Sequence, residues 1–317
     1  MAPNIPNPAS EITGSQDRVI RDSSCDKPKL YILSEFHPVA VQHAQQLFDC
    51  VLYGDPEGKN WRNNATAILI KDYHITQSDL AAAPQLQVIG KQGFGLDKID
   101  IEACNRGGVK ICNSPGINAG AVAEMTLCLA LSVAKEVPQL VLRQRAQGEV
   151  IRKETVAGLL LSGKTVGIAS IIAFDPYYVK GHGPWDGIPH RRVDSLEDLI
   201  DVSDVISVHV PLTHETTNLI SALEIKRMKR NAILLNTARG GIVNESDLAE
   251  ALQNGYIWGA GFDCHVQEPP TLELYRDLWN SPRFVGTPHI AAATDETQIA
   301  TINAAVDGVY RYLQQSA

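Results

Sequence analysis

From residue 30 onward, short apolar runs alternate with segments of helical periodicity, and this alternation limits the fold more than any other feature. The first half has four such runs, at residues 30–33, 67–70, 86–89 and 109–112. Helical patterns separate them, at residues 39–48, 77–82 and 101–106. Strands that alternate with helices are typical of a parallel sheet with helices on its faces. The first half therefore predicts a small doubly wound domain.

The second half repeats this rhythm. Its expected strands lie at residues 165–174, 205–210, 232–236, 259–263 and 284–287. Its expected helices lie at residues 196–200, 221–228 and 245–254, with Asn244 as the N-cap of the last. We therefore expect an α/β protein with two doubly wound parallel-sheet domains of the Rossmann or flavodoxin-like kind.

Two long helical segments define the expected domain boundaries. Residues 119–147 predict a long helix that connects the domains or packs against a partner subunit, with an ordinary core helix as the alternative. Residues 295–313 have apolar positions at helical spacing and are expected to fold back onto the first domain.

The predicted substrate domain consequently comprises residues 30–118 with residues 290–317, and the second domain comprises residues 119–289. Residues 1–29 are rich in Asn, Pro, Ser and Asp. We expect this segment to be a flexible tail because it can bury little apolar surface.

The composition argues against several classes of protein. The net charge of −8 and the lack of any basic run argue against nucleic-acid binding, which relies on clustered Lys and Arg. The six cysteines have no paired spacing, so we expect reduced thiols, no metal site and a cytoplasmic location. The longest apolar run, residues 121–134, is shorter than the ~20 residues that span a bilayer, so no membrane is expected as a partner.

Three chemically active residues follow strands of the second half, where parallel sheets place their ligand crevice. The planar guanidinium of Arg239 suits a carboxylate, and the glycine pair after it allows close approach of the backbone. A carboxylate such as Glu268 would hold the ring of His289 in one tautomer and raise its pKa. We expect Arg239 to anchor a 2-keto acid and His289, tuned by Glu268, to exchange the hydroxyl proton. Each residue alone is more often structural, and only their combination supports this hypothesis.

Four segments resemble the signatures of the D-isomer-specific 2-hydroxyacid dehydrogenases, in that family's order. They are VIGKQGFGLDKIDIEACNRGGVKICNSPGINAGAVAE, SDVISVHVPLTHETTNLIS, LLNTARGGIVNESDLAEALQNGYIWGAGFDCHVQEPP and TPHIAAAT. The resemblance extends over about residues 86–294 and implies an oxidoreductase that transfers a hydride between NAD and a small 2-keto or 2-hydroxy acid. It also implies a homodimer, to which residues 119–147 would contribute.

The resemblance also assigns residues to the site. The catalytic residues that it implies are Arg239, Glu268 and His289. The substrate-binding residues that it implies are Arg239 and the loop Gly93, Phe94 and Gly95, whose backbone N–H groups would hold the substrate carboxylate. The cofactor-binding residues that it implies are Asp175, Pro211, Thr237, Ala238 and Asp263. Asp175 would meet the adenosine ribose and favour NAD over NADP, because a 2′-phosphate there would face a like charge.

One local difference from the family lies in DCHVQEP. His265 and Val266 stand where the family usually has an aromatic residue and an acidic or small residue. We expect these two residues and the loop 93–96 to shape the pocket for the substrate side chain. His265 is expected to be a partly exposed loop residue without a catalytic role.

A glycine-rich turn and a helix are missing from GKTVGIASIIAFDPYY, residues 163–178. The family carries both between two strands, whereas here Ala169 and Ser170 alone separate residues 165–168 from residues 171–174. Two linking residues span at most ~11 Å, and a parallel crossover has to return along a strand of ~17–20 Å. The cofactor domain is therefore predicted to lack one β-α crossover near residues 168–171. Residues 165–174 would form one long strand, or half of them would pair.

The missing turn leaves three hypotheses open. The chain is an active dehydrogenase, although with weakened folding and weakened NAD binding. Alternatively, it is a dehydrogenase-like protein without turnover that acts by binding or by pairing with an intact relative. The third possibility is a wrongly spliced gene sequence of an active enzyme. Neither Gly93-Phe94-Gly95 nor GHGPWDG, residues 181–187, has the spacing and setting of the missing turn.

Overall fold

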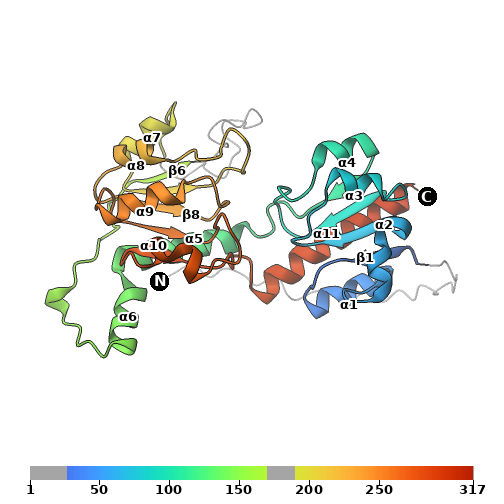
Figure 1. The fold of residues 1–317 in the computed structure, drawn as a ribbon, viewed down its shortest axis with the longest axis horizontal. Coiled ribbons are helices and arrows are strands. Elements are labelled where there is room, and N and C mark those ends of the chain that lie inside the picture. The colour runs from blue at the N-terminus through green and yellow to red at the C-terminus, as the bar shows by residue number, and fades with distance from the viewer. Residues whose placement is uncertain (1–26, 170–189, 317) are drawn as a thin grey trace, which may run out of the picture.

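The computed structural model describes residues 27–169 and 190–316, which form two lobes (Figure 1). Each lobe contains a parallel sheet with five described strands, in the orders β2-β1-β3-β4-β5 and β10-β9-β8-β7-β6. Helices cover both sheets. The expected α/β class with two doubly wound parallel sheets is confirmed.

The first sheet consists of one unexpected and four expected strands. These are β1 (Lys29–Ile32), β2 (Asp49–Val51), β3 (Ala67–Ile70), β4 (Val88–Lys91) and β5 (Lys110–Cys112). Every residue of β3 and β4 is buried, as in a parallel sheet that is covered on both faces. The unexpected β2 is a three-residue edge strand that begins at the exposed Asp49, so it has no continuous apolar run to reveal it.

Short helices connect the strands of this sheet. They are α1 (Pro38–Leu47), the 3-10 helix η1 (Pro56–Asn60), α2 (Trp61–Asn64), α3 (Gln77–Ala81) and α4 (Ile101–Gly107). The chain then returns to this lobe through α11 (Asp295–Ser316). Its residues Ile302, Val306 and Val309 are buried against Leu30 and Val88, as the amphipathic pattern predicted.

The second sheet consists of β6 (Val166–Ala169), β7 (Val205–Val208), β8 (Ile233–Asn236), β9 (Gly259–Phe262) and β10 (Phe284–Gly286). Its helices are α7 (Leu196–Val202), α8 (Ala222–Arg227), α9 (Glu245–Gln253) and α10 (Leu272–Trp279), with the 3-10 helix η2 (Lys153–Thr155) preceding the sheet. The side chain of Asn244 accepts from the Asp247 N–H, which confirms it as the N-cap of α9. Helix α10 was not expected.

Residues 119–147 form two helices, α5 (Ala119–Lys135) and α6 (Val137–Ala146), so the expectation of one long helix is wrong. The two helices are bent by 62° at Glu136, which has a left-handed φ of 54°. Pro138 has no N–H to donate to the Ala134 carbonyl, and this carbonyl instead accepts from the Leu159 N–H at 2.7 Å. The bend follows from the proline, which the sequence shows.

Helix α5 covers one face of the second sheet. Leu129 and Val133 on this helix are buried against Val205, Ile233 and Leu235. Within the described ranges, no single helix has both the length and the apolar content needed to cross a membrane. The bent pair α5 and α6 meets both criteria only when taken together.

Strand β6 forms one end of the described second sheet and pairs with β7 in parallel. The first half of the stretch at residues 165–174 therefore pairs, which is compatible with both expectations for this stretch. The expected strand at residues 171–174, Asp175 and the loop 181–187 lie outside the described residues, as do residues 1–26 of the expected tail.

Candidate active site

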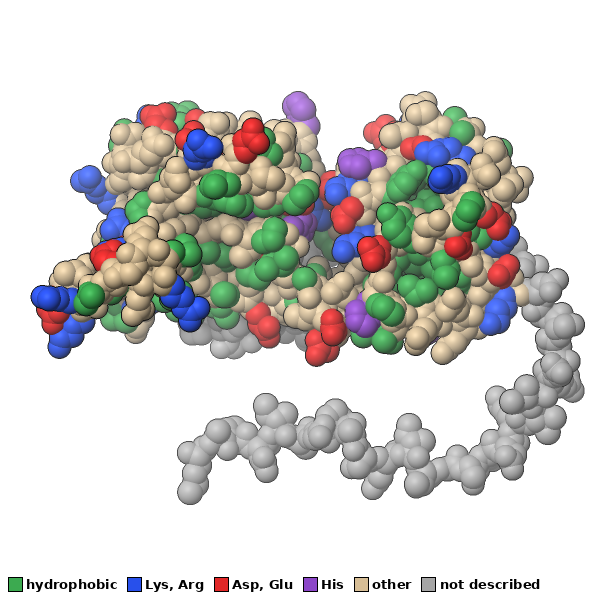
Figure 2. Space-filling model, turned by 60° about the horizontal axis from the view of Figure 1, so that its bottom comes forward, with side chains coloured by type: hydrophobic (Ala, Val, Ile, Leu, Met, Phe, Trp, Pro, Cys, Tyr) green, Lys and Arg blue, Asp and Glu red, His purple; other side chains and the backbone are tan. Residues whose placement is uncertain are grey.

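Three loops at one edge of the second sheet carry the expected catalytic residues. Arg239 follows β8, Glu268 follows β9 and His289 follows β10, and these three strands are neighbours in the sheet. Because the carboxyl ends of parallel strands share an edge, their loops come together there. Figure 2 shows charged and histidine side chains gathered where the two lobes face each other.

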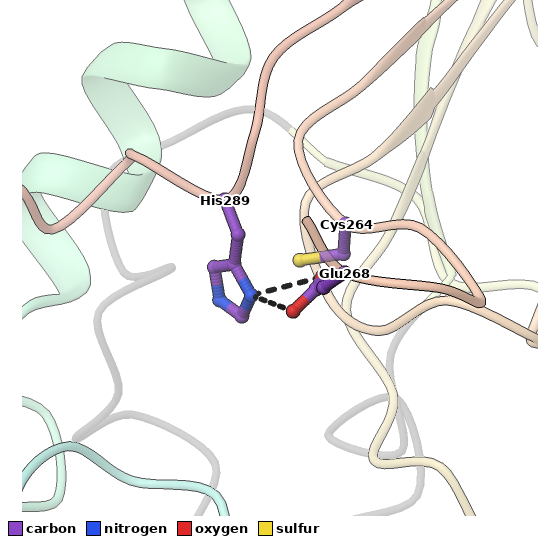
Figure 3. Close-up of side chains that lie close together, drawn as sticks. All are labelled: Cys264, Glu268 and His289. Atoms are coloured by element: carbon purple, nitrogen blue, oxygen red, sulfur yellow. Dashed lines mark hydrogen bonds and ion pairs between the residues drawn. The ribbon is translucent and has the colours of Figure 1, made fainter. Parts of the chain in front are cut away.

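Glu268 binds the imidazole of His289. Nδ1 of His289 lies 3.0 and 2.9 Å from Oε1 and Oε2 of Glu268, so Nδ1 donates to the carboxylate (Figure 3). Burial alone would raise the pKa of Glu268, but the bond to His289 holds this pKa below its usual value. The adjacent Cys264 sulphur and the Glu268 carboxylate raise the pKa of His289 to about 10. The ring is consequently an imidazolium at neutral pH, with Nε2–H remaining as a proton donor.

The buried carboxylate of Asp263 fixes the backbone around His289. Oδ1 accepts from Thr287 Oγ1 at 2.6 Å and from the Ile290 N–H at 2.9 Å, and Oδ2 accepts from the Ala291 N–H at 3.0 Å. The His289 N–H donates to the Asp263 carbonyl at 2.7 Å. His289 has a φ of 55°, a left-handed conformation that is rare outside glycine and persists where its surroundings enforce it. Asp263 therefore positions the imidazole.

Arg239 connects the two lobes at the site. Its Nε donates to Asp97 Oδ1 at 2.9 Å, and its Nη1 donates to the Ala238 carbonyl at 2.7 Å. A Cβ atom on Gly95 would overlap Nη2 of Arg239, so the guanidinium is packed directly against the Gly95 backbone. Asp97 was missed as a site residue, although an acid two positions after a loop expected to meet an arginine was a usable signal.

The loop Gly93–Gly95 lies opposite Arg239 at the end of β4. Gly93 has a φ of 87°, and its N–H donates to Ser114 Oγ at 2.8 Å. Ser114 in turn donates its N–H to the Gly93 carbonyl at 3.1 Å. Since the Gly93 N–H is engaged, Phe94 and Gly95 are the members of this loop that can offer N–H groups to a carboxylate.

The structure also locates three of the expected cofactor-binding residues. Thr237 and Ala238 lie between β8 and Arg239, and the Thr237 hydroxyl is 3.0 Å from that of Thr126 on α5. Pro211 lies in the loop after β7, and its carbonyl accepts from Thr216 Oγ1 at 2.6 Å. All three therefore lie beyond the carboxyl ends of adjacent strands.

His265 is buried, so the expectation of a partly exposed loop residue is wrong. The residue is 3% exposed and lies among Phe262, Tyr275, Trp279 and Phe284, with its ring centroid 4.9 Å from that of Tyr275. Two of these rings, those of Tyr275 and Trp279, belong to the unexpected helix α10, which shields His265 from solvent. Burial lowers the pKa of His265 and therefore favours the neutral ring.

Cys264 is a further residue at the site, beyond those expected from the sequence. It is buried, and its Sγ donates to the Ala238 carbonyl at 3.3 Å. Its sulphur, a ring nitrogen of His289 and a carboxylate oxygen of Glu268 all lie within 4.8 Å of one another. The only local signal that Cys264 belongs to the site was its position directly after Asp263.

Comparison with known proteins identifies relatives of both lobes. Residues 169–291 match the family model described as D-isomer specific 2-hydroxyacid dehydrogenase, NAD binding domain. A hydroxypyruvate reductase of Thermotoga maritima is 35% identical over 242 residues, which are 71% of this chain and 76% of that protein. A glyoxylate reductase of Thermococcus litoralis is 32% identical over 302 residues, which are 86% of this chain and 89% of that protein.

Other relatives are much longer than this chain. A D-3-phosphoglycerate dehydrogenase of Methanocaldococcus jannaschii is 36% identical over 244 residues, which are 71% of this chain but only 45% of that protein. The chain thus spans less than half the length of this relative.

Solved structures show the same two-lobed fold. A Thermus thermophilus protein superposes with a TM-score of 0.78 at 28% identity, with 90% of this chain and 97% of that chain covered. The D-lactate dehydrogenase of Aquifex aeolicus, complexed with NAD and lactic acid, superposes with a TM-score of 0.74 at 24% identity. That match covers 91% of this chain and 96% of that chain and shows the fold alone.

Proposed function

The chain belongs to the D-isomer-specific 2-hydroxyacid dehydrogenases, and from this premise we propose that it transfers a hydride between NAD(H) and a small 2-keto or 2-hydroxy acid. The observation that carries the proposal is the Glu268–His289 pair, with its 2.9 Å bond, beside a guanidinium that interacts with the Glu268 charge. Reduction of a 2-keto acid requires a carboxylate anchor and a proton donor that lie close together.

In this mechanism, the substrate carboxylate binds Nη2 of Arg239 and the N–H groups of Phe94 and Gly95. His289 donates the Nε2 proton to the carbonyl oxygen during reduction and takes it back from the hydroxyl during oxidation. Glu268 keeps Nδ1 protonated and stabilises the imidazolium. Asp97 holds the guanidinium through Nε and leaves its outer edge to the substrate. When bound, the nicotinamide cofactor supplies or accepts the hydride.

The residues around β8 and β9 fit the nicotinamide end of NAD. Thr237 and Ala238 present small side chains there, and Oδ2 of Asp263 accepts one described hydrogen bond, so it has acceptor capacity left. Pro211 would line the adenosine side, and Asp175 would bind its ribose. The diphosphate end fits poorly, because Ala169 at the end of β6 is followed by Ser170 and Ile171 and not by a glycine-rich turn. We therefore propose NAD as the cofactor, bound more weakly than a complete turn would allow.

A second candidate function is a dehydrogenase-like protein without turnover that pairs with an intact relative, and the same missing turn favours it. Sequencing the transcript distinguishes these two functions from the third hypothesis, a wrongly spliced gene sequence. If the splicing is wrong, the transcript should encode a glycine-rich turn and a helix between Ile168 and Ile171. Fluorescence titration with NADH tests the weakened binding, and micromolar affinity would contradict it. The proposed activity itself is tested by oxidation of NADH in the presence of small 2-keto acids.

We also propose a homodimer that forms through α5 and α6. Large apolar side chains on these helices are exposed, which an interface with a second copy would cover; they are Leu127, Leu131, Val141 and Leu142. A cytoplasmic location is proposed from the scattered cysteines of the sequence, which have no disulfide-type spacing.

A further inference from the structure

Cys264 adds a sulphur ligand to a site whose proposed chemistry uses only the carboxylate and the imidazole. One ligand atom from each of Cys264, Glu268 and His289 lies within 4.8 Å of the other two (Figure 3). We propose that these three side chains bind a divalent transition-metal ion, preferably Zn²⁺. The bound ion would suppress the proposed proton transfer by His289.

The donor set selects the class of ion. Thiolate sulphur, imidazole nitrogen and carboxylate oxygen are the ligands of Zn²⁺ and of Co²⁺ in the same geometry, whereas Mg²⁺ and Ca²⁺ prefer oxygen alone. Zn²⁺ binds sulphur at about 2.3 Å and nitrogen or oxygen at about 2.0–2.2 Å, so the three atoms would have to draw together by about 1 Å. Three protein ligands leave a fourth position for water on the exposed side of His289.

The backbone holds the two ligand-bearing loops together before any ion arrives. Cys264 and Glu268 lie on the loop after β9, and His289 lies on the loop after β10. Asp263, directly before Cys264, accepts the N–H groups of Ile290 and Ala291, directly after His289. Glu268 Oε1 also accepts from the His265 N–H at 3.2 Å. Little further ordering is therefore needed, which favours binding.

Arg239 opposes the bound cation, since its charge interacts with both Cys264 and Glu268. Two negative ligands offset this repulsion, because the thiol becomes a thiolate beside the carboxylate. In the binding step the ion loses water, Cys264 releases its thiol proton, and His289 releases the Nδ1 proton that it donates to Glu268. No electron is transferred. The ion takes the place of the proton that joins the ring to Glu268, so His289 becomes a neutral, metal-bound imidazole. Its Nε2–H remains but is a weaker acid than that of the imidazolium, so it is a poorer proton donor.

Co²⁺ provides a test that does not depend on turnover, because thiolate ligation gives an intense charge-transfer absorption in the near ultraviolet. We expect titration of the full chain to produce this band with a stoichiometry of one ion per chain, and Zn²⁺ to abolish it. The Cys264→Ala variant should lose the band, and the Cys128→Ser variant, which changes an exposed cysteine on α5, should keep it. Cys264→Ser preserves the size of the side chain and should also lose the band, with circular dichroism confirming that it is folded.

Two results would overturn the proposed metal site. One is the absence of a saturable band in the unmodified chain, and the other is a band that persists at full strength in folded Cys264→Ala or Cys264→Ser. Zn²⁺ should also slow NADH oxidation in the unmodified chain, with the rate restored by a chelator. Because the Co²⁺ band requires neither NAD nor a substrate, loss of the proposed activity would not affect this test.

Discussion

The guanidinium of Arg239 lies where a Cβ atom of residue 95 would be, so a side chain at Gly95 and the present position of Arg239 exclude each other. Gly95 follows β4 in the first lobe, whereas Arg239 follows β8 in the second. The ion pair between Arg239 and Asp97 is formed across the same boundary. The proposed carboxylate site is thus assembled from both lobes, and its geometry depends on one glycine.

Gly95→Ala should displace the guanidinium and weaken substrate binding. We expect KM for a 2-keto acid to rise by about tenfold or more, as for the loss of a charged hydrogen bond of about 1.5–3 kcal/mol. Gly120→Ala is a matched control, because a Cβ there meets no atom within 4 Å. Steady-state kinetics decide the matter, and an unchanged KM in Gly95→Ala would show that Arg239 does not anchor the substrate.

Glu268→Gln should shift the pH dependence of 2-keto acid reduction. The imidazolium of His289 is the required form, and with a pKa of about 10 the rate should hold through neutral pH and fall as the pH passes about 10. Without the carboxylate the pKa of His289 moves part of the way back toward the ordinary value of about 6.5, since Cys264 still raises it, so the fall should begin at a lower pH. A pH–rate profile measures this shift. Coincident profiles for the two proteins would assign the proton transfer to another group.

Asp263→Asn should destabilise the fold as well as the site. The change removes one of two carboxylate oxygens that accept from Thr287, Ile290 and Ala291, and it leaves a buried N–H group unpaired. The expected loss in the free energy of unfolding is about 1–3 kcal/mol. Chemical denaturation measures it, with Glu102→Gln on the surface of α4 as the control. Equal stability of the two variants would refute the positioning role of Asp263.

Lys91→Met should stabilise the protein at pH 7. Lys91 is buried at the end of β4, and burial lowers its pKa to about 8. The charged groups that act on it are Asp72, Arg239, Asp97 and Lys98. The unfolded chain has a pKa near 10.4 for this group and binds more protons between the two values, so stability rises with pH from about 8 to about 10.4.

Lys91→Met removes the increase of stability between about pH 8 and pH 10.4, because Met does not titrate. The substitution should raise the free energy of unfolding at pH 7 by about 1–3 kcal/mol. The lower end allows for the lost hydrogen bond from Lys91 Nζ to the Gln92 carbonyl. Denaturation curves at several pH values measure the difference, with Lys110→Met on the exposed edge of β5 as the control. A stability difference that does not change with pH would contradict the assigned pKa.

The buried strands could be predicted from the sequence, and so could the position of each catalytic residue after a strand, because both depend on local patterns of residues. Apolar runs mark β3 and β8, and strand ends place Arg239, Glu268 and His289 at one edge of the sheet. Local patterns did not reveal β2, a short edge strand with no such run. The bend at Glu136 was also unexpected, although Pro138 is a signal for it.

Contacts between distant segments were beyond local patterns. His265 is buried because α10 covers it, and the contact between Gly95 and Arg239 joins residues from different lobes. The position of Cys264 beside His289 likewise depends on how Asp263 holds two loops together. Such relationships require the arrangement of the strands in space.

We propose that this chain reduces a 2-keto acid with a hydride from NADH and a proton from His289. The most direct measurement is NADH oxidation by the purified full chain, at NADH concentrations high enough to offset weak binding, with glyoxylate, hydroxypyruvate and pyruvate. We predict oxidation above background with at least one acid, and its loss in His289→Gln. No oxidation above background with any of the three acids would contradict the proposed activity. It would leave the second candidate function, a dehydrogenase-like protein without turnover.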